Sequence, residues 1–178
     1  EMVANVEAGY ADYETVSGRA YLAGPITEKI SADIALTALD QGEGWGRNLT
    51  LNRESRLQDN KGARSKMVLK ASETLKFTVA GDYFENDESI ALGYKIDPGT
   101  LGTGGTRGPA GQDTTLNSFP STKQEFYGGS LTAEADFGFA TLTSISAFRR
   151  SVNRSDFDVD GGPFTRIRIA FTSGTKAF

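Results

Sequence analysis

The clearest candidate for chemistry in this sequence is the run DFDVDG at residues 156–161, in which three carboxylates alternate with other residues before a glycine. This pattern opens the calcium-binding loop of an EF-hand, where oxygen ligands surround a hard cation. The twelfth position of such a loop is a bidentate Glu, whereas here it is Ile167. We therefore interpret Asp156, Asp158 and Asp160 as a solvated acidic loop and assign no metal, with loose calcium binding as the weaker alternative.

A glycine-rich stretch at residues 99–108 invites comparison with a phosphate-binding loop, which needs a Lys-Ser or Lys-Thr pair after its last glycine and a helix behind it. Neither follows here, so we interpret the stretch as the tip of a long loop in which Arg107 can contact an anionic ligand. Three further ligand contacts are expected in long loops, at Trp45, Arg47 and Tyr94. The indole of Trp45 can stack on a ligand or anchor its strand at a membrane interface, and we prefer the anchoring role.

The composition excludes several classes of protein. The chain has no Cys and no His, which removes disulfides, thiol chemistry and His-ligated metals. Without His there is no proton shuttle suited to neutral pH, and no nucleophile is placed beside a base, so we expect neither an enzyme nor a cofactor. The net charge of -4 argues against nucleic acid as a partner, because phosphate binding needs a basic field.

Six segments alternate apolar and polar residues with the period of two that is typical of strands. Their apolar faces are rich in Ala and Gly, which fill a protein core poorly, and their opposite faces carry charges of both signs, which suits a hydrated lumen. A seventh segment, residues 140–150, is predicted to be extended, with faces too similar to assign. The apolar positions are Ala4, Val6, Ala8 and Tyr10; Val16, Gly18, Ala20 and Leu22; Ile30, Ala32, Ile34, Leu36 and Ala38; Met67, Leu69 and Ala71; Leu75, Phe77, Val79 and Tyr83; and Tyr127, Leu131 and Ala133.

The lengths of these segments favour a membrane barrel over a soluble sheet. Each has about 9–12 residues, close to the ~9–11 of a tilted transmembrane strand and longer than the ~5–6 typical of soluble strands. No run approaches the ~20 apolar residues of a membrane helix. Aromatic residues lie near the segment ends, where interfacial girdles are expected. They are Tyr10, Tyr13, Tyr83, Phe84, Phe126, Tyr127, Phe137, Phe139 and Phe148.

The links between the segments are predicted to alternate strictly between short and long. Short links follow Gly24, Ala71 and Ala135, and long Gly-, Asn- and Asp-rich links span residues 41–61 and 87–122. Short periplasmic turns and longer external loops are typical of outer-membrane barrels. The core face of a soluble β-sandwich is the alternative for any single segment.

We expect a polar tail, and no further strand, after about Asn153. Stepping back by twos from Phe178 reaches Lys176, which places a charge where a lipid-facing strand needs an apolar group. The sequence is accordingly predicted to be a piece of a longer protein that lacks its closing strand.

The order of several short motifs resembles the barrel of a TonB-dependent outer-membrane receptor, in the first strands after its plug domain. The motifs are GYADY at residues 9–13, SG at 17–18, GPITEK at 24–29, DQGEGW at 40–45, GAR at 62–64 and FGFATLTSISAFR at 137–149. The resemblance implies an all-β, antiparallel, up-and-down transmembrane β-barrel. Such receptors have about 22 strands around a plugged lumen. Residues 1–178 would then be part of one barrel domain, present as an open partial wall of about seven strands.

The resemblance also implies a function and partners. The chain would be a fragment of an active importer in the Gram-negative outer membrane, in contact with outer-membrane lipid and driven by the TonB energy-coupling complex through the absent plug. Its ligand would be a ferric siderophore, a cobalamin or another scarce nutrient. A passive or structural barrel without a plug, and a soluble β-sandwich binding module, are the alternatives.

Five cations are predicted to face the lumen, and each can pair with a plug or with an acid across the wall. The acids available across the wall are Asp33, Asp82 and Glu134. The cations are Arg19, Arg64, Lys66, Lys70 and Lys76.

Overall fold

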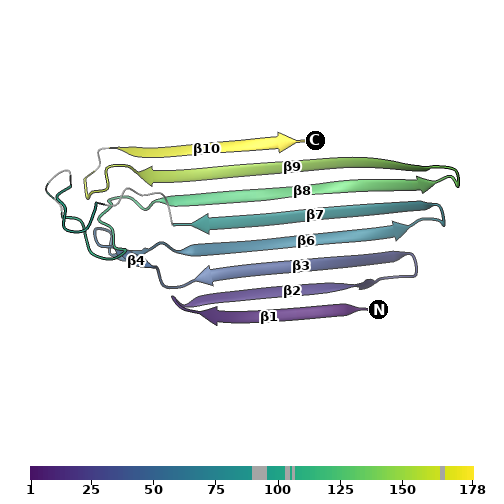
Figure 1. Cartoon of the computed structure of the whole chain (residues 1–178), viewed down its shortest axis with the longest axis horizontal. Helices are drawn as coiled ribbons and strands as arrows, with labels where there is room; N and C mark the ends of the chain where they lie inside the picture. The colour runs from purple at the N-terminus through teal and green to yellow at the C-terminus, as the bar shows by residue number, and fades with distance from the viewer. Residues whose placement is uncertain (90–95, 103–104, 106, 165–166) are drawn as a thin grey trace.

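The computed structural model describes residues 1–89, 96–102, 105, 107–164 and 167–178. Its long strands form one eight-stranded antiparallel sheet in which each strand lies beside the next long strand of the chain (Figure 1). They are β1 (Val3–Ala11), β2 (Thr15–Pro25), β3 (Ile30–Gln41), β6 (Gln58–Lys70), β7 (Leu75–Glu88), β8 (Ser121–Asp136), β9 (Thr141–Asp158) and β10 (Arg168–Ala177). Two short strands, β4 (Gly46–Asn48) and β5 (Arg53–Ser55), form a separate hairpin. The predicted all-β, up-and-down arrangement is confirmed, with eight strands where we expected about seven.

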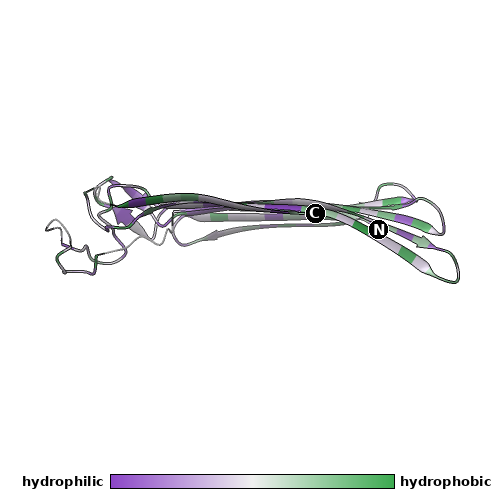
Figure 2. Ribbon diagram, turned by 90° about the horizontal axis from the view of Figure 1, so that it is seen from above, coloured by the Kyte–Doolittle hydropathy of each residue, from purple (hydrophilic) through white to green (hydrophobic). Residues whose placement is uncertain are grey.

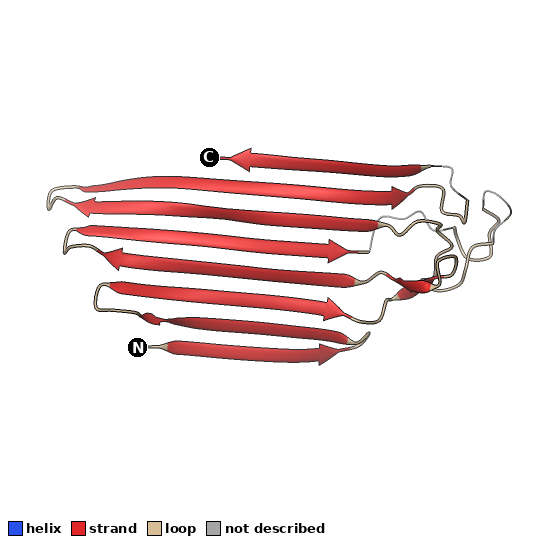
Figure 3. Cartoon of the chain, turned by 180° about the vertical axis from the view of Figure 1, so that it is seen from behind, coloured by secondary structure: helices blue, strands red, loops and turns tan. Residues whose placement is uncertain are grey.

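The sheet is open and consists of one layer. The first and last strands, β1 and β10, lie at opposite edges and do not pair with each other (Figures 1 and 3). Seen from above, the eight long strands form a single layer, and the described residues place no other sheet or helix over it (Figure 2). None of the described residues forms a helix that is long and apolar enough to cross a membrane. The predicted open partial wall is confirmed as the architecture of this chain.

The two ends of the sheet differ in their connections. At one end, which we call the turn end, residues 26–29, 71–74 and 137–140 form tight turns. At the other, the loop end, the connections are residues 12–14, 42–57, 89–120 and 159–167 (Figure 3). The segregation of long loops to one end agrees with our expectation.

The predicted strict alternation of short and long links is wrong for the first connection. Residues 12–14 form a tight turn although they lie at the loop end. The turn closes because Tyr13 and Glu14 both adopt left-handed backbone conformations, with φ of 63° and 51°. Their carbonyl oxygens then accept hydrogen bonds from Glu43 and Gly42 at the end of β3.

The predicted polar tail is also wrong. Strand β9 continues to Asp158, and β10 adds a further strand beside it. These polar residues can belong to strands because they pair across the sheet, as Arg168 does with Asp156. Residue Lys176 lies opposite Arg150, and the ring of Phe178 packs at 5.3 Å from that of Phe148. The charge at Lys176 therefore does not interrupt an apolar surface, because its neighbour on β9 is also charged.

The strand register confirms the predicted faces. Directly opposed residues of an antiparallel pair share a face. The apolar positions oppose one another across successive strands, as in Val6 with Ala20, and Met67 with Val79. The register also assigns the face that the sequence left open on β9, where Leu142, Ser144, Ser146 and Phe148 lie with the apolar set.

This apolar set is exposed, and we call it the apolar band. Its large side chains include Val6 at 80% exposure and Ile34 at 42%, although most hydrophobic groups of such size are buried in soluble proteins. Leu116 and Val152 are the buried hydrophobic residues of the described chain. The prediction that no second layer covers the apolar face is therefore confirmed for the residues described.

Two predicted girdle residues lie on the opposite face. Phe84 and Phe126 oppose each other, and Phe84 also opposes Gly62. They lie on the face opposite the apolar band, which we call the inward face; the face of the apolar band is the outward face. Tyr83, one residue before Phe84, and Tyr127, one residue after Phe126, oppose each other on the outward face. Proximity to a strand end did not distinguish the two sides, because adjacent residues of a strand point in opposite directions.

Candidate functional site

Two of the predicted ligand contacts, Trp45 and Arg47, are engaged by residues around them. The indole of Trp45 is 43% exposed and meets the ring of Tyr13 edge-on at 6.4 Å. The guanidinium of Arg47 donates to Glu54 and to Asn52 in the β4–β5 hairpin. Among the contacts of the described residues, none joins these side chains into one binding site.

The remaining two contacts lie in the connection between β7 and β8. The guanidinium of Arg107 donates to the carbonyl of Gly99 at 2.7 Å, which closes the glycine-rich tip on itself. Tyr94 lies outside the described residues.

Three loop segments that are far apart in sequence pack together at the loop end, and we call this assembly the loop cap. It joins the β4–β5 hairpin to residues 112–118 and 158–161. Thr114 donates its amide to the carbonyl of Arg47 and accepts from Leu49, both at 2.9 Å. Gly46 allows this approach, because a Cβ there would lie 2.3 Å from the carbonyl oxygen of Gln112.

The three acidic residues of the DFDVDG run are used separately. The carboxylate of Asp156 accepts from Arg168, and Asp158 is 1% exposed and accepts from the hydroxyl of Ser118 at 3.3 Å. The carboxylate of Asp160 accepts the amides of Gly162 and Ile167, at 3.0 and 3.1 Å. Among the described residues, no group of three His, Cys, Asp or Glu side chains is arranged to hold a metal ion.

The inward face pairs most of its cations with acids on neighbouring strands. Lys66 lies 3.4 Å from Asp33, and Lys76 lies 2.7 Å from Glu134. Arg19 approaches Glu7 at 3.8 Å. Lys66 and Lys76 therefore pair with acids of the predicted set, whereas Arg19 pairs with Glu7, an acid outside that set.

The other two predicted lumen cations behave differently. Residue Asp82 lies opposite Arg64 but receives two hydrogen bonds from Arg149, at 2.7 and 3.0 Å. Within the part of the chain that the structure describes, Arg64 and Lys70 have no ion pair. Both are therefore available to a group that approaches the inward face.

A shallow hollow lies beside Arg64 on the inward face. It has a volume of about 500 Å³ and includes the rings of Tyr21 and Phe84. Gly62 forms part of its floor, and a Cβ there would approach the ring of Phe84 at 3.0 Å. Aromatic walls and one unpaired cation are typical of sites for organic molecules. The sequence did not predict the hollow, because it is assembled from five strands.

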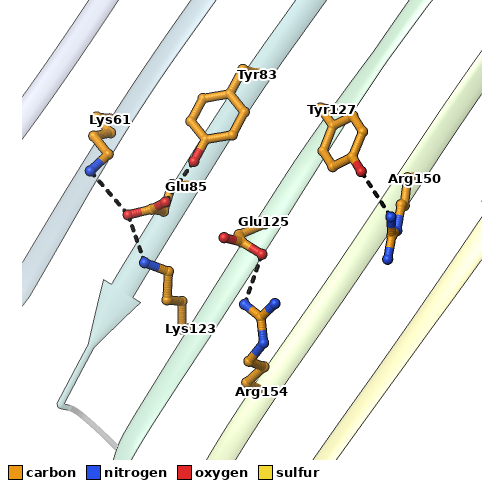
Figure 4. Close-up of polar contacts among 8 residues, drawn as sticks. All are labelled: Lys61, Tyr83, Glu85, Lys123, Glu125, Tyr127, Arg150 and Arg154. Carbon is orange, nitrogen blue, oxygen red and sulfur yellow. Dashed lines mark hydrogen bonds and ion pairs between the residues drawn. The ribbon is translucent and has the colours of Figure 1, made fainter.

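The outward face changes character toward the loop end, where charged side chains replace apolar ones. The change follows the same face, since Tyr83 and Glu85 are two residues apart on β7, and Lys61 lies directly opposite Glu85. We call this region the charged belt (Figure 4). Its members are Asp40, Asp59, Lys61, Glu85, Asp87, Lys123, Glu125, Arg150, Arg154, Asp156, Arg168 and Lys176.

Glu85 is the centre of the largest polar network in the belt. Its carboxylate accepts from the hydroxyl of Tyr83 at 2.5 Å and lies 3.1 Å from Lys61 and 3.0 Å from Lys123 (Figure 4). The side chain is 12% exposed. A second pair lies beside it, in which Arg154 contacts Glu125 at 2.8 Å.

The network holds its charges firmly. The hydroxyl of Tyr83, followed by the ammonium groups of Lys123 and Lys61, lowers the pKa of Glu85 to about 2. In turn, hydrogen bonding to Glu85 raises the pKa of Lys123. Hydrogen bonds from Arg168 likewise lower the pKa of Asp156 at the far end of the belt. These groups lie beyond the apolar band and remain charged over the ordinary pH range.

The sequence contained a signal for the belt that we did not use. Continuing the apolar alternation beyond Tyr83 reaches Glu85 and Asp87, and continuing it back from Tyr127 reaches Glu125 and Lys123. Our predicted strands stopped where the apolar residues stopped. The strands themselves continue into the belt, where pairing between charges replaces apolar contacts.

Comparison with known proteins adds no relatives: no family model matches the chain, and no curated protein or solved structure matches it. Function is therefore inferred from the residues and their arrangement.

Proposed function

We propose that this chain forms part of the wall of a β-barrel in the Gram-negative outer membrane. The observation that carries the proposal is the uncovered apolar band, which extends from Val6 on β1 to Leu142 on β9. Soluble monomers rarely expose contiguous apolar patches larger than a few hundred Å². Lipid tails provide the partner that such a face needs, and antiparallel pairing satisfies the backbone groups between neighbouring strands, as a membrane-spanning wall requires.

Three further features support this location. The tight turns at residues 26–29, 71–74 and 137–140 lie at the opposite end of the sheet from the long loops, as in barrels with short periplasmic turns. The inward face carries paired charges, which suit a hydrated lumen. Tyr83 and Tyr127 lie where the apolar band meets the charged belt, a position that aromatic side chains favour at a membrane interface.

The soluble β-sandwich receives no such support. A sandwich buries the apolar face of one sheet beneath a second sheet about 10 Å away. The described residues provide no second layer over Val6, Ile34 or Val79, which are 80%, 42% and 45% exposed.

Within this proposal, the motif resemblance assigns the wall to a TonB-dependent importer of a ferric siderophore or another scarce nutrient. The ligand would bind external loops and the plug and pass along the inward face. Energy coupling would act through the plug of such a receptor. The unpaired Arg64 beside the inward hollow is consistent with an anionic ligand or an acidic plug segment on this side.

Membrane fractionation and uptake assays test the two levels of the proposal. A Gram-negative strain that expresses the gene encoding this chain should hold the product in its outer-membrane fraction. Deleting the gene should reduce uptake of one ferric siderophore or cobalamin, and an uncoupler of the inner-membrane proton gradient should reduce it equally. If the product is in the outer membrane but the uncoupler does not change uptake, a passive barrel would be supported instead. A product in the soluble fraction would contradict the membrane wall.

A further inference from the structure

Two cations of the charged belt differ from the others because no acid pairs with them. The ion pairs of the described belt residues account for Lys61, Lys123, Arg154 and Arg168. Arg150 donates to the hydroxyl of Tyr127 at 3.1 Å, and Glu125, the nearest acid on β8 by register, is engaged by Arg154. Within the described residues, neither Arg150 nor Lys176 has an ion pair.

These two cations are also direct neighbours. Arg150 on β9 lies opposite Lys176 on β10, so both side chains leave the same face of the sheet at the same level. Like charges directly opposed across two strands destabilise the pair. An anion bound between them would remove this repulsion and accept hydrogen bonds from both.

The surroundings point to the chemistry of that anion. Two residues toward the turn end, Phe148 and Phe178 pack at 5.3 Å on the same face, and Tyr127 packs on Phe148 at 6.3 Å. Cations at the level of Tyr127, above an aromatic patch that continues into the apolar band, match a molecule with an anionic head and an apolar tail.

We propose that Arg150 and Lys176 bind the phosphate of a lipid headgroup on the outward face, with the acyl chains against Phe148 and Phe178. The inference depends on the proposed membrane location and adds a specific site for an anionic lipid. A guanidinium recognises phosphate oxygens through two parallel donors, and an ammonium adds a point charge.

Flotation with lipid vesicles tests the site. The refolded chain is mixed with vesicles of phosphatidylcholine alone or with a minority of phosphatidic acid, and the floated fraction is measured over a range of lipid concentrations. We expect tighter association with the phosphatidic acid vesicles. Each cation that is removed should weaken association with the phosphatidic acid vesicles by about fivefold. The double substitution Arg150→Gln with Lys176→Gln should therefore remove the preference.

The matched control removes two unpaired cations from the other face. Arg64→Gln with Lys70→Gln changes the net charge by the same amount and should keep the preference. Lys176→Glu places an acid opposite Arg150, so it should retain or increase strand content in circular dichroism while losing the preference. This variant separates loss of the site from loss of the fold.

Four outcomes would overturn the inference. An equal loss in both double variants would assign the preference to overall charge. Displacement by inorganic phosphate at matched ionic strength would assign the site to the free anion. Binding to phosphatidylcholine without any preference for phosphatidic acid would remove the lipid site while leaving the membrane wall intact, whereas failure to float with either vesicle would remove both proposals.

Discussion

The outward face of the sheet has two halves that obey the same alternation but follow different pairing rules. On the turn side, apolar residues such as Val6 and Ile34 are exposed and have no layer over them. On the loop side, charged residues such as Glu85 are largely covered by their partners. In the proposed membrane location the exposed apolar residues would face lipid tails, and the paired charges would lie among water and headgroups. The boundary between the halves therefore marks where the surroundings of one surface change.

The position of this boundary varies from strand to strand. On β1 and β2 the apolar set extends to Tyr10 and Val16, which are paired residues near the loop end. On β7 and β8 charges begin at the pair Glu85 and Glu125. A boundary that crosses the rows of paired residues obliquely is expected where strands tilt relative to a membrane.

The largest expected effect comes from placing a charge in the apolar band. Ile34→Arg should destabilise the protein in lipid by about 2–4 kcal/mol, because a cation near the bilayer midplane loses its hydration. The measurement is the folded fraction after refolding into phosphatidylcholine vesicles over a urea series.

The control for this substitution is Ser31→Arg, which places the same charge on the inward face of the same strand, opposite the uncharged residues Pro25 and Val68. It should refold with a yield close to that of the unmodified chain. Equal loss in the two variants would show that the two faces of β3 do not experience different solvents.

The band and the belt differed in how well the sequence predicted them. Alternation at positions such as Leu22 and Val79 was a sufficient signal for strands and faces, because period-two burial is a local property. The belt and β10 were missed because charged residues on strands give no apolar period. Their stability depends on partners such as Glu85 and Lys123, which are brought together only by register.

The loop contacts were the least predictable part. We could place Trp45 and Arg47 in a loop from the surrounding glycines, but not find their partners. The partners of the β4–β5 hairpin lie in residues 112–118, more than sixty positions away. No local pattern encodes such a contact, so the sequence could not show that Trp45 and Arg47 contact different partners.

The second prediction concerns the charged network of the belt. Glu85→Gln should destabilise the sheet by about 1–3 kcal/mol, because Lys61, Lys123 and Tyr83 lose a charged acceptor. Glu7→Gln is the control, since Glu7 forms an exposed pair at 3.8 Å and should cost less than about 0.5 kcal/mol. The free energy of unfolding of both variants is measured by chemical unfolding in detergent. An equal loss in the two would show that the network around Glu85 is no stronger than an exposed ion pair.

The same network predicts a pH dependence. The pKa of Glu85 is lowered from 4.5 to about 2, so its contribution to stability is present above about pH 4.5 and is lost as the pH falls toward 2. Glu85→Gln should reduce the loss of stability between these two values. An unchanged pH profile in the variant would contradict the depressed pKa.

The third prediction compares an open position with a crowded one. Gly46→Ala places a Cβ 2.3 Å from the carbonyl oxygen of Gln112, whereas Gly18→Ala meets nothing within 4 Å. The first change should detach residues 112–118 from the hairpin at a cost of about 1–2 kcal/mol. Faster hydrogen exchange at Thr114 and Leu49, with unchanged exchange in the long strands, would report this. Retained protection at both amides would contradict the packing of the loop cap.

The smallest expected effect compares a turn at each end of the sheet. Glu14 at the loop end has a φ of 51°, a conformation that costs a non-glycine residue about 1–2 kcal/mol. Glu14→Gly should therefore stabilise the protein by up to about 1 kcal/mol, after allowing for the greater freedom of glycine in the unfolded chain. Glu28 at the turn end is not among the positive-φ residues, so Glu28→Gly should destabilise by about 0.5 kcal/mol. Thermal unfolding should show a stability change of opposite sign in the two variants, which would locate backbone strain in the turn at residues 12–14. Changes of the same sign would contradict strain at Glu14.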